Sequence, residues 1–235
     1  MSMPKTLCVG LENMVDSDER ENAMMLYYIT MLRSFIASVV DFILPPRRTQ
    51  RAVDMLMQED LRRLQNAGKL PYRTPEASAL IWELKYYGSK KAAALAGEFL
   101  AEELLAIASE ELGPPLLIPV PMHPRRRQER GHNQTELLCE AALRHLGAPP
   151  DAAYVYAPRA LARIKPTQEQ QKLGRAARLT NVIGSMQATE PEKIKGRACV
   201  VVDDVTTTGA TLAEAARALK AAGAARVHLV ALAQS

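Results

Sequence analysis

The chain has 235 residues, of which 48% are hydrophobic, 24% are charged and only 5% are aromatic. This composition is typical of a globular protein and excludes a disordered, collagen-like or disulfide-rich chain. The three cysteines, Cys8, Cys139 and Cys199, lie far apart in the sequence, so they predict neither a zinc site nor a disulfide framework. Reduced thiols of this kind are typical of a cytoplasmic protein.

The net charge of +4 is unevenly distributed along the chain. Residues 1–114 contain 13 basic and 16 acidic residues, whereas residues 115–235 contain 17 basic and 10 acidic residues. We therefore expect the C-terminal half to face an anionic partner. The charge count alone does not distinguish a nucleic acid from a phosphorylated metabolite.

The most apolar segment, residues 23–44, approaches the length of a membrane span. Arg33 and Asp41 interrupt it and acidic residues precede it, so we expect neither a membrane span nor a signal peptide. Its apolar residues recur at helical spacing, at Met25, Tyr28, Leu32, Phe35, Val39 and Ile43. The pattern predicts an amphipathic helix that packs on its own chain, on a second subunit as a homodimer contact, or on a membrane surface.

The rest of the chain divides into two regions that differ in predicted secondary structure. Residues 45–114 predict helices, over residues 50–66, 76–87 and 90–112. Residues 115–235 alternate between the two kinds of element, with strands expected over 116–120, 153–156, 181–186, 198–202 and 227–233 and helices over 133–146 and 212–222. This alternation predicts an α/β core with a central, mainly parallel sheet flanked by helices, after an N-terminal tail and helix over residues 1–44.

The sharpest motif follows the apolar strand at 198–202. Two acidic residues, Asp203 and Asp204, come at its carboxyl end, where open α/β sheets bind ligands. A loop of small and hydroxyl-bearing residues then leads into a helix: Val205, Thr206, Thr207, Thr208, Gly209, Ala210 and Thr211. The N–H groups at such a helix start favour a phosphate, and paired carboxylates bind a ribose diol or a hydrated Mg²⁺.

This motif lacks the Gly-Lys-Ser/Thr of a Walker A loop and the Gly-x-Gly-x-x-Gly of dinucleotide sites. Over residues 199–211 it resembles the phosphoribosyl pyrophosphate (PRPP) motif of the type I phosphoribosyltransferases. A plain alternative is a turn in which Thr208 caps an ordinary helix.

A second cluster of polar residues follows the strand at 116–120. Pro121, Met122 and His123 lead into four arginines, Arg125, Arg126, Arg127 and Arg130, and then into a helix whose first turn carries Asn133 and Gln134. Arginine forks suit bidentate phosphate binding, although a run of arginines is also typical of a solvated surface.

A basic loop over residues 158–180 is the third candidate. Residues 159–178 hold six basic residues, among them Arg163 and Lys165, against the single acidic residue Glu169. A long polar loop in a compact domain is often a lid, here one suited to pyrophosphate. A nucleic-acid-binding or disordered loop remains the alternative.

Together these three segments are similar to the ComF family, and residues 79–88 resemble the helical segment that precedes its transferase core. Most of that family carry an N-terminal cysteine-rich zinc module, whereas this chain has no cysteine near Pro45 and Pro46. We therefore expect no zinc. The family's usual aromatic residue after Arg-Gly is His132 here, which favours a packing role for that histidine.

The resemblance implies a Mg²⁺- and PRPP-binding transferase that passes the phosphoribosyl group to an amine or nucleobase and releases pyrophosphate. Asp203 and Asp204 correspond to the ribose and metal ligands, and Val205–Thr211 to the 5′-phosphate loop. Catalytic contacts to pyrophosphate fall on Arg163 and Lys165, with further PRPP contacts from Pro121, Met122 and Arg130.

The resemblance leaves a second function open, because ComF proteins are associated with DNA uptake in natural transformation. In that function the protein keeps a PRPP pocket but acts on single-stranded DNA. The sequence shows no obvious aromatic stacking platform, since we expect most of Trp82, Tyr86, Tyr87, Tyr154 and Tyr156 to lie in the core or on strand faces.

Overall fold

The computed structural model describes Met25 and residues 46–147, 153–165 and 182–235. The chain divides into two compact units, Met1–Pro45 and Pro46–Ser235. The expected amphipathic helix and its homodimer contact therefore lie outside the described residues, Met25 excepted. Among the helices that the structure describes, none combines the length and apolar character that crossing a membrane requires.

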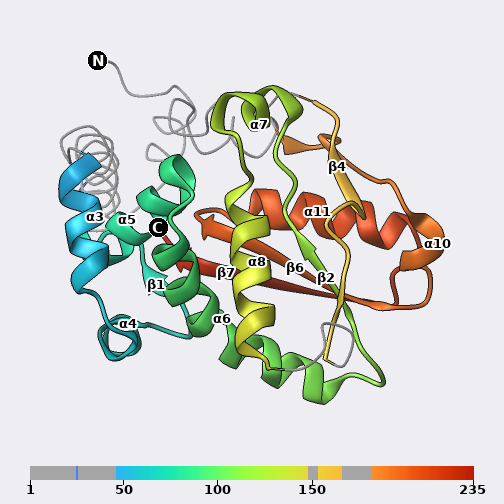
Figure 1. Ribbon diagram of the computed structural model, residues 1–235. Coiled ribbons are helices and arrows are strands. Elements are labelled where there is room, and N and C mark those ends of the chain that lie inside the picture. The colour runs from blue at the N-terminus through green and yellow to red at the C-terminus, as the bar shows by residue number, and fades with distance from the viewer. Residues whose placement is uncertain (1–24, 26–45, 148–152, 166–181) are drawn as a thin grey trace, which may run out of the picture. The chain divides into compact units, whose positions relative to one another are not determined.

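A five-stranded sheet forms the centre of the second unit (Figure 1). Its strands lie in the order β1 (Leu70–Pro71), β7 (Arg226–Gln234), β6 (Ala198–Thr206), β2 (Leu116–Pro119) and β3 (Val155–Tyr156). Every neighbouring pair is parallel. The predicted parallel α/β core is thus confirmed. The strand β1 was expected only as a short connecting segment.

Both faces of the sheet are buried, which explains the continuous apolar runs in β2 and β6. Leu117, Val200 and Val202 point to one face and pack with α6 (Lys90–Glu110) and α8 (Gln134–His145). Ile118 and Val201 point to the other face and pack with α11 (Ala210–Ala221). Figure 1 shows α6 and α8 on the face opposite α11.

A small antiparallel sheet lies beside this core. It pairs β4 (Leu161–Arg163) with β5 (Met186–Ala188), and α10 (Pro191–Ile194) follows it. The sequence predicted a loop where β4 forms, and it placed the strand of β5 too early. The buried carboxylate of Glu214 on α11 accepts the main-chain N–H of Met186 (3.1 Å), which ties this sheet to the core.

The helical region before the core is more broken than expected. The helix predicted over residues 50–66 is two helices, α3 (Pro46–Met55) and α4 (Gln58–Leu64). The helix predicted over residues 76–87 is α5 (Pro75–Trp82) followed by a π-helical turn, η1 (Glu83–Tyr87). Gly88 ends η1 in the left-handed conformation (φ 56°), as expected for a closing glycine. Such π turns are frequent at functional sites.

The helices α6 and α8 approach each other closely at Gly97. A Cβ atom at this position would lie 2.5 Å from Cβ of Ala141 and 2.6 Å from the backbone N of Ala142. Because the obstacle includes backbone, the two helices would have to separate to accept any side chain.

We therefore predict that Gly97→Ala destabilises the protein by about 1–3 kcal/mol in chemical denaturation, as overpacking of a core does. Ala94→Ser, at an exposed position of the same helix, should change the stability by less than about 0.5 kcal/mol. Helix propensity alone predicts the opposite sign for Gly97→Ala, a gain of about 1 kcal/mol. A gain of that kind would contradict the close helix contact.

Candidate functional site

The site begins where β6 extends beyond its neighbour β2. Val202 pairs with Pro119, the last residue of β2, so Asp203 and Asp204 continue past the end of that strand. Both aspartates are nevertheless buried, with 7% and 5% of their surface exposed. Two carboxylates therefore lie side by side in a poorly hydrated position, which is costly unless partners compensate them.

The compensation comes from the backbone and from two distant side chains. The N–H of Asp204 donates to Oδ1 of Asp203 (2.9 Å), and the N–H of Val205 donates to Oδ1 of Asp204 (2.8 Å). Oδ2 of Asp204 lies 3.3 Å from Nζ of Lys85 and accepts a hydrogen bond from Nε2 of Gln134 (3.3 Å). Asp204 thus connects the sheet to η1 and to the start of α8.

The predicted phosphate loop leads from the aspartates into α11. Its N-cap residue is Gly209 in the left-handed conformation (φ 74°), a backbone shape that favours glycine, and no side chain caps the helix there. The cap that the alternative interpretation assigned to Thr208 is therefore absent. Thr207 is exposed, and Thr208 to Thr211 are partly exposed. The first-turn N–H groups and the positive end of the helix dipole suit an anion at this position.

The turn after β2 lies beside the aspartates and meets β4. The N–H of Val120 donates to the carbonyl of Val202 (2.9 Å), and Nε of Arg163 donates to the carbonyl of Pro121 (3.0 Å). The structure thus brings together Arg163 and the Pro121–Met122 turn, which the sequence assigned separately to pyrophosphate. Lys165 is exposed just beyond β4.

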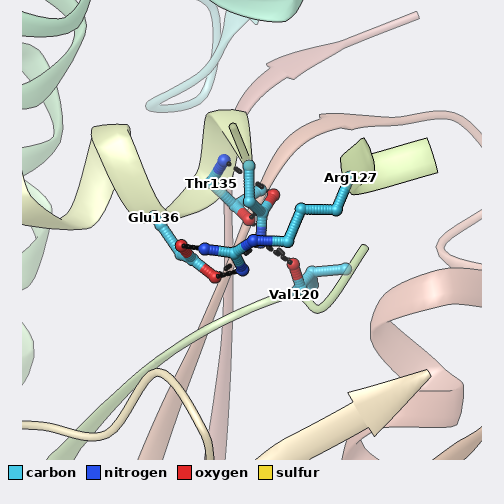
Figure 2. A network of polar contacts seen from close by, with 5 residues as sticks. Val120, Arg127, Thr135 and Glu136 are labelled. Carbon is cyan, nitrogen blue, oxygen red and sulfur yellow. Dashed lines mark hydrogen bonds and ion pairs between the residues drawn. The ribbon is translucent and has the colours of Figure 1, made fainter. Parts of the chain in front are cut away.

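Figure 2 shows how the start of α8 is fixed on this turn. Oγ1 of Thr135 donates to the carbonyl of Val120 (2.7 Å), and the N-cap residue Asn133 donates to the same carbonyl (3.2 Å). Arg127, on α7 (Pro124–Arg130), binds both carboxylate oxygens of Glu136 (2.5 and 2.8 Å). Among the clustered arginines, Arg127 therefore forms an ion pair with Glu136 of the same chain.

The remaining predicted polar residues have helix-end or packing contacts. His123 caps α7, where its Nδ1 accepts the N–H of Arg125 (3.3 Å). Nε2 of His132 lies 2.8 Å from the carbonyl of Leu84, so this histidine packs against η1. The guanidinium of Arg130 lies over the ring of Tyr86, 4.8 Å from its centroid.

Sequence reasoning missed Lys85 as part of this site. Residues 79–88 carried a family resemblance, but no local signal connected this lysine to an aspartate 119 positions later. Gln134 was expected only as a general polar contact of its helix. Both become recognisable once η1 and α8 pack against the end of β6.

Comparison with known proteins indicates the family to which this chain belongs. A model of the phosphoribosyl transferase domain matches residues 141–235. The DNA utilization protein YhgH of Salmonella typhi is 37% identical over 158 residues, which cover 66% of this chain and 66% of that protein. Competence protein F of Haemophilus influenzae is 32% identical over 123 residues, which cover 52% of this chain and 51% of that protein. The chain belongs to the ComF-like proteins with the type I phosphoribosyltransferase fold.

The ComF-like chain spans about two thirds of the length of the YhgH proteins that it matches. Among solved structures, the allosteric regulatory enzyme of purine biosynthesis matches 64% of this chain and 29% of the enzyme chain, with 19% identity and a TM-score of 0.36. The glutamine PRPP amidotransferase of B. subtilis matches 63% of this chain and 30% of the amidotransferase chain, with 20% identity and a TM-score of 0.37.

The two aspartates of the ComF-like site differ in their electrostatic surroundings. Burial and the neighbouring charge of Asp204 raise the pKa of Asp203 to about 8. Burial also acts on Asp204, but the positive charge of Lys85 and the hydrogen bonds it receives outweigh burial and lower its pKa. Asp204 is therefore the member of the pair that ionises more readily.

The two carboxylates fit a magnesium ion that takes most of its ligands from water and substrate. The described residues contain no cluster of three or more His, Cys, Asp or Glu side chains placed to hold a metal. Two carboxylates, however, suit Mg²⁺, which is commonly bound through one or two protein carboxylates together with water and substrate phosphates. Asp203 and Asp204 would hold such an ion, directly or through water.

The raised pKa of Asp203 predicts a pH-dependent stability. Its folded-state pKa lies above the usual value of 3.8, so the folded state binds this proton more tightly than the unfolded state. This contribution to stability is lost as the pH rises towards about 8. Asp203→Asn should remove the loss, and we expect it to raise the melting temperature in metal-free buffer above that pH by about 2–4 °C for each kcal/mol of destabilisation that it removes.

The gain should shrink as the pH falls towards the usual carboxyl range, and Asp54→Asn, an exposed carboxylate on α3, should show no such trend. A melting temperature for Asp203→Asn that is lower than that of the wild type at high pH would show that ionisation of Asp203 does not destabilise the folded protein.

Proposed function

We propose that this ComF-like domain binds Mg²⁺ and PRPP and transfers the phosphoribosyl group to an amine or nucleobase with release of pyrophosphate. The observation that carries the proposal is the burial of Asp203 and Asp204 at the end of β6, followed at once by an uncapped helix start. The two halves suit the two ends of a ribose 5-phosphate, because carboxylates accept hydroxyl hydrogen bonds and helix N-termini favour phosphate.

In this proposal each segment has one task. Asp203 and Asp204 bind the ribose hydroxyls, and residues 205–211 surround the 5′-phosphate. Arg163, Lys165 and the Pro121–Met122 turn lie on the side of the pyrophosphate. Mg²⁺, when bound, neutralises charge on that leaving group.

The reaction asks for positioning and charge neutralisation more than for a nucleophile on the protein. The acceptor nitrogen forms a bond to C1 of the ribose while the bond from C1 to the pyrophosphate oxygen breaks. The leaving pyrophosphate carries away the electron pair of that bond, and in this proposal the positive charge of Arg163 stabilises the departing oxygen. The acceptor loses a proton to solvent.

Isothermal titration calorimetry with PRPP and Mg²⁺ tests this function. We expect the wild type and the control Asp54→Asn to bind, and Asp203→Asn/Asp204→Asn to lose binding by at least about a hundredfold, or about 2.7 kcal/mol. A screen for pyrophosphate release over nucleobases and amines then identifies the acceptor. Absence of PRPP binding by the wild type would refute the proposal.

A second candidate function is binding of single-stranded DNA, and a specific surface supports it. The sequence predicted that most aromatic residues lie in the core or on strand faces, but Tyr86 and Tyr87 are 45% and 50% exposed. The guanidinium of Arg130 lies over the ring of Tyr86, and Trp82 packs on the same ring with centroids 4.4 Å apart. Exposed aromatic rings beside arginines are the usual elements of a single-strand site. YhgH is named a DNA utilization protein.

Because Arg130 and Trp82 cover the ring of Tyr86, we predict for this candidate that Tyr87→Ala weakens binding to an oligo-dT probe by about 5- to 150-fold, the range expected for the loss of one stacked base. Tyr87→Phe should retain most of the affinity because it keeps the ring. Fluorescence anisotropy over a salt series measures both effects, and the affinity should fall as salt rises. Equal binding by wild type and Tyr87→Ala would remove this surface from consideration.

A further inference from the structure

The ion pair between Lys85 and Asp204 joins the helical region to the end of the sheet. The two side chains are 22% and 7% exposed, and their charged atoms lie 3.3 Å apart. Exposed ion pairs contribute little to stability, but removal of one partner of a buried pair leaves the other charge uncompensated. The contact therefore bears directly on the state of Asp204.

The position of Lys85 is fixed from several sides. It lies in the π turn η1. Two residues earlier, Glu83 is buried and accepts a hydrogen bond from Oγ1 of Thr49 (2.7 Å). His132 contacts the carbonyl of Leu84 on the other side. The ammonium group of Lys85 also lies 5.9 Å from the centroid of the Tyr72 ring, which favours a cation. A lysine side chain is flexible in itself, but the held backbone of η1 and the contacts of the ammonium group with Asp204 and Tyr72 restrict where its charge lies.

The contacts of Asp204 leave this carboxylate little freedom. Oδ1 accepts the N–H of Val205, while Oδ2 faces both Lys85 and Gln134. Three partners from three separate segments therefore define its orientation. Lys85 supplies the positive charge among them.

We propose that Lys85 is a positioning residue of the PRPP site, which orients Asp204 and compensates its charge so that the acidic pair is ready to receive a ribose. This inference rests on the proposed PRPP-binding function. It makes η1 a part of the ligand site and not only a support for the core.

A merely structural role for Lys85 makes a different prediction. In that case its loss lowers the stability of the protein but leaves the ligand affinity of the folded fraction unchanged. A positioning role requires the affinity itself to fall, and it requires a cation at this position to restore it. Affinity and stability therefore have to be measured separately on the same variants.

The experiment compares Lys85→Met, Lys85→Arg and the control Lys90→Met in the full chain. Lys90 is an exposed lysine at the start of α6, close in sequence but outside the site. Calorimetry with Mg²⁺ and PRPP gives the affinity, and chemical denaturation gives the stability. We expect Lys85→Met to bind at least about tenfold more weakly than the wild type, Lys85→Arg to recover most of that loss, and Lys90→Met to bind normally.

The outcomes separate this inference from the function on which it rests. Normal affinity in Lys85→Met, whatever its stability, would overturn the inference and leave the proposed function intact. Equal weakening in Lys85→Met and Lys85→Arg would also overturn it, because the charge would then be irrelevant. No binding by the wild type would overturn both. If Lys85→Met does not fold, Lys85→Gln, which keeps a hydrogen-bond donor towards Asp204, provides the test with the same expected loss.

Discussion

The burial of two adjacent carboxylates at the end of β6 is the constraint around which this site is organised. Burying like charges together is unfavourable, and the protein offsets the cost with main-chain N–H groups, an amide and one lysine. These partners come from the sheet, from η1 and from α8. Because the groups that compensate the charge belong to separate segments, the packing of those segments and the state of Asp203 and Asp204 depend on each other.

The parallel sheet explains why these parts meet. The carboxyl ends of β2 and β6 lie side by side, so the turn at Pro121 and the acidic pair share one edge. The carbonyl of Val120 then anchors the start of α8, and Arg163 reaches the same turn from the small sheet. The raised pKa of Asp203 means that ionisation of this carboxyl lowers the stability of the ligand-free protein. Such a loss of stability is common where a site is arranged for function.

Much of the fold, including the strand, loop and helix from Ala198 to Ala221, could be predicted from the sequence because the signals are local. The apolar run before Asp203 and the glycine of the loop describe strand, turn and helix within a dozen residues. Strands β1 and β4 are too short for a periodic pattern, and the π turn resembles an ordinary helix in sequence. The contact between Lys85 and Asp204 depends on tertiary packing, which no spacing rule encodes. For the same reason the contact of Arg130 with Tyr86 could not be anticipated.

We have proposed that the end of β6 and the start of α11 form one binding site for a phosphorylated ribose. A crystal structure of the full chain with Mg²⁺ and PRPP tests it most directly. We expect the 5′-phosphate to lie on the main-chain N–H groups of residues 208–211 and the ribose hydroxyls to contact Asp203 and Asp204. A ligand bound instead among the arginines of α7, without contact to Asp203 or Asp204, would show that this edge of the sheet is not the ribose site.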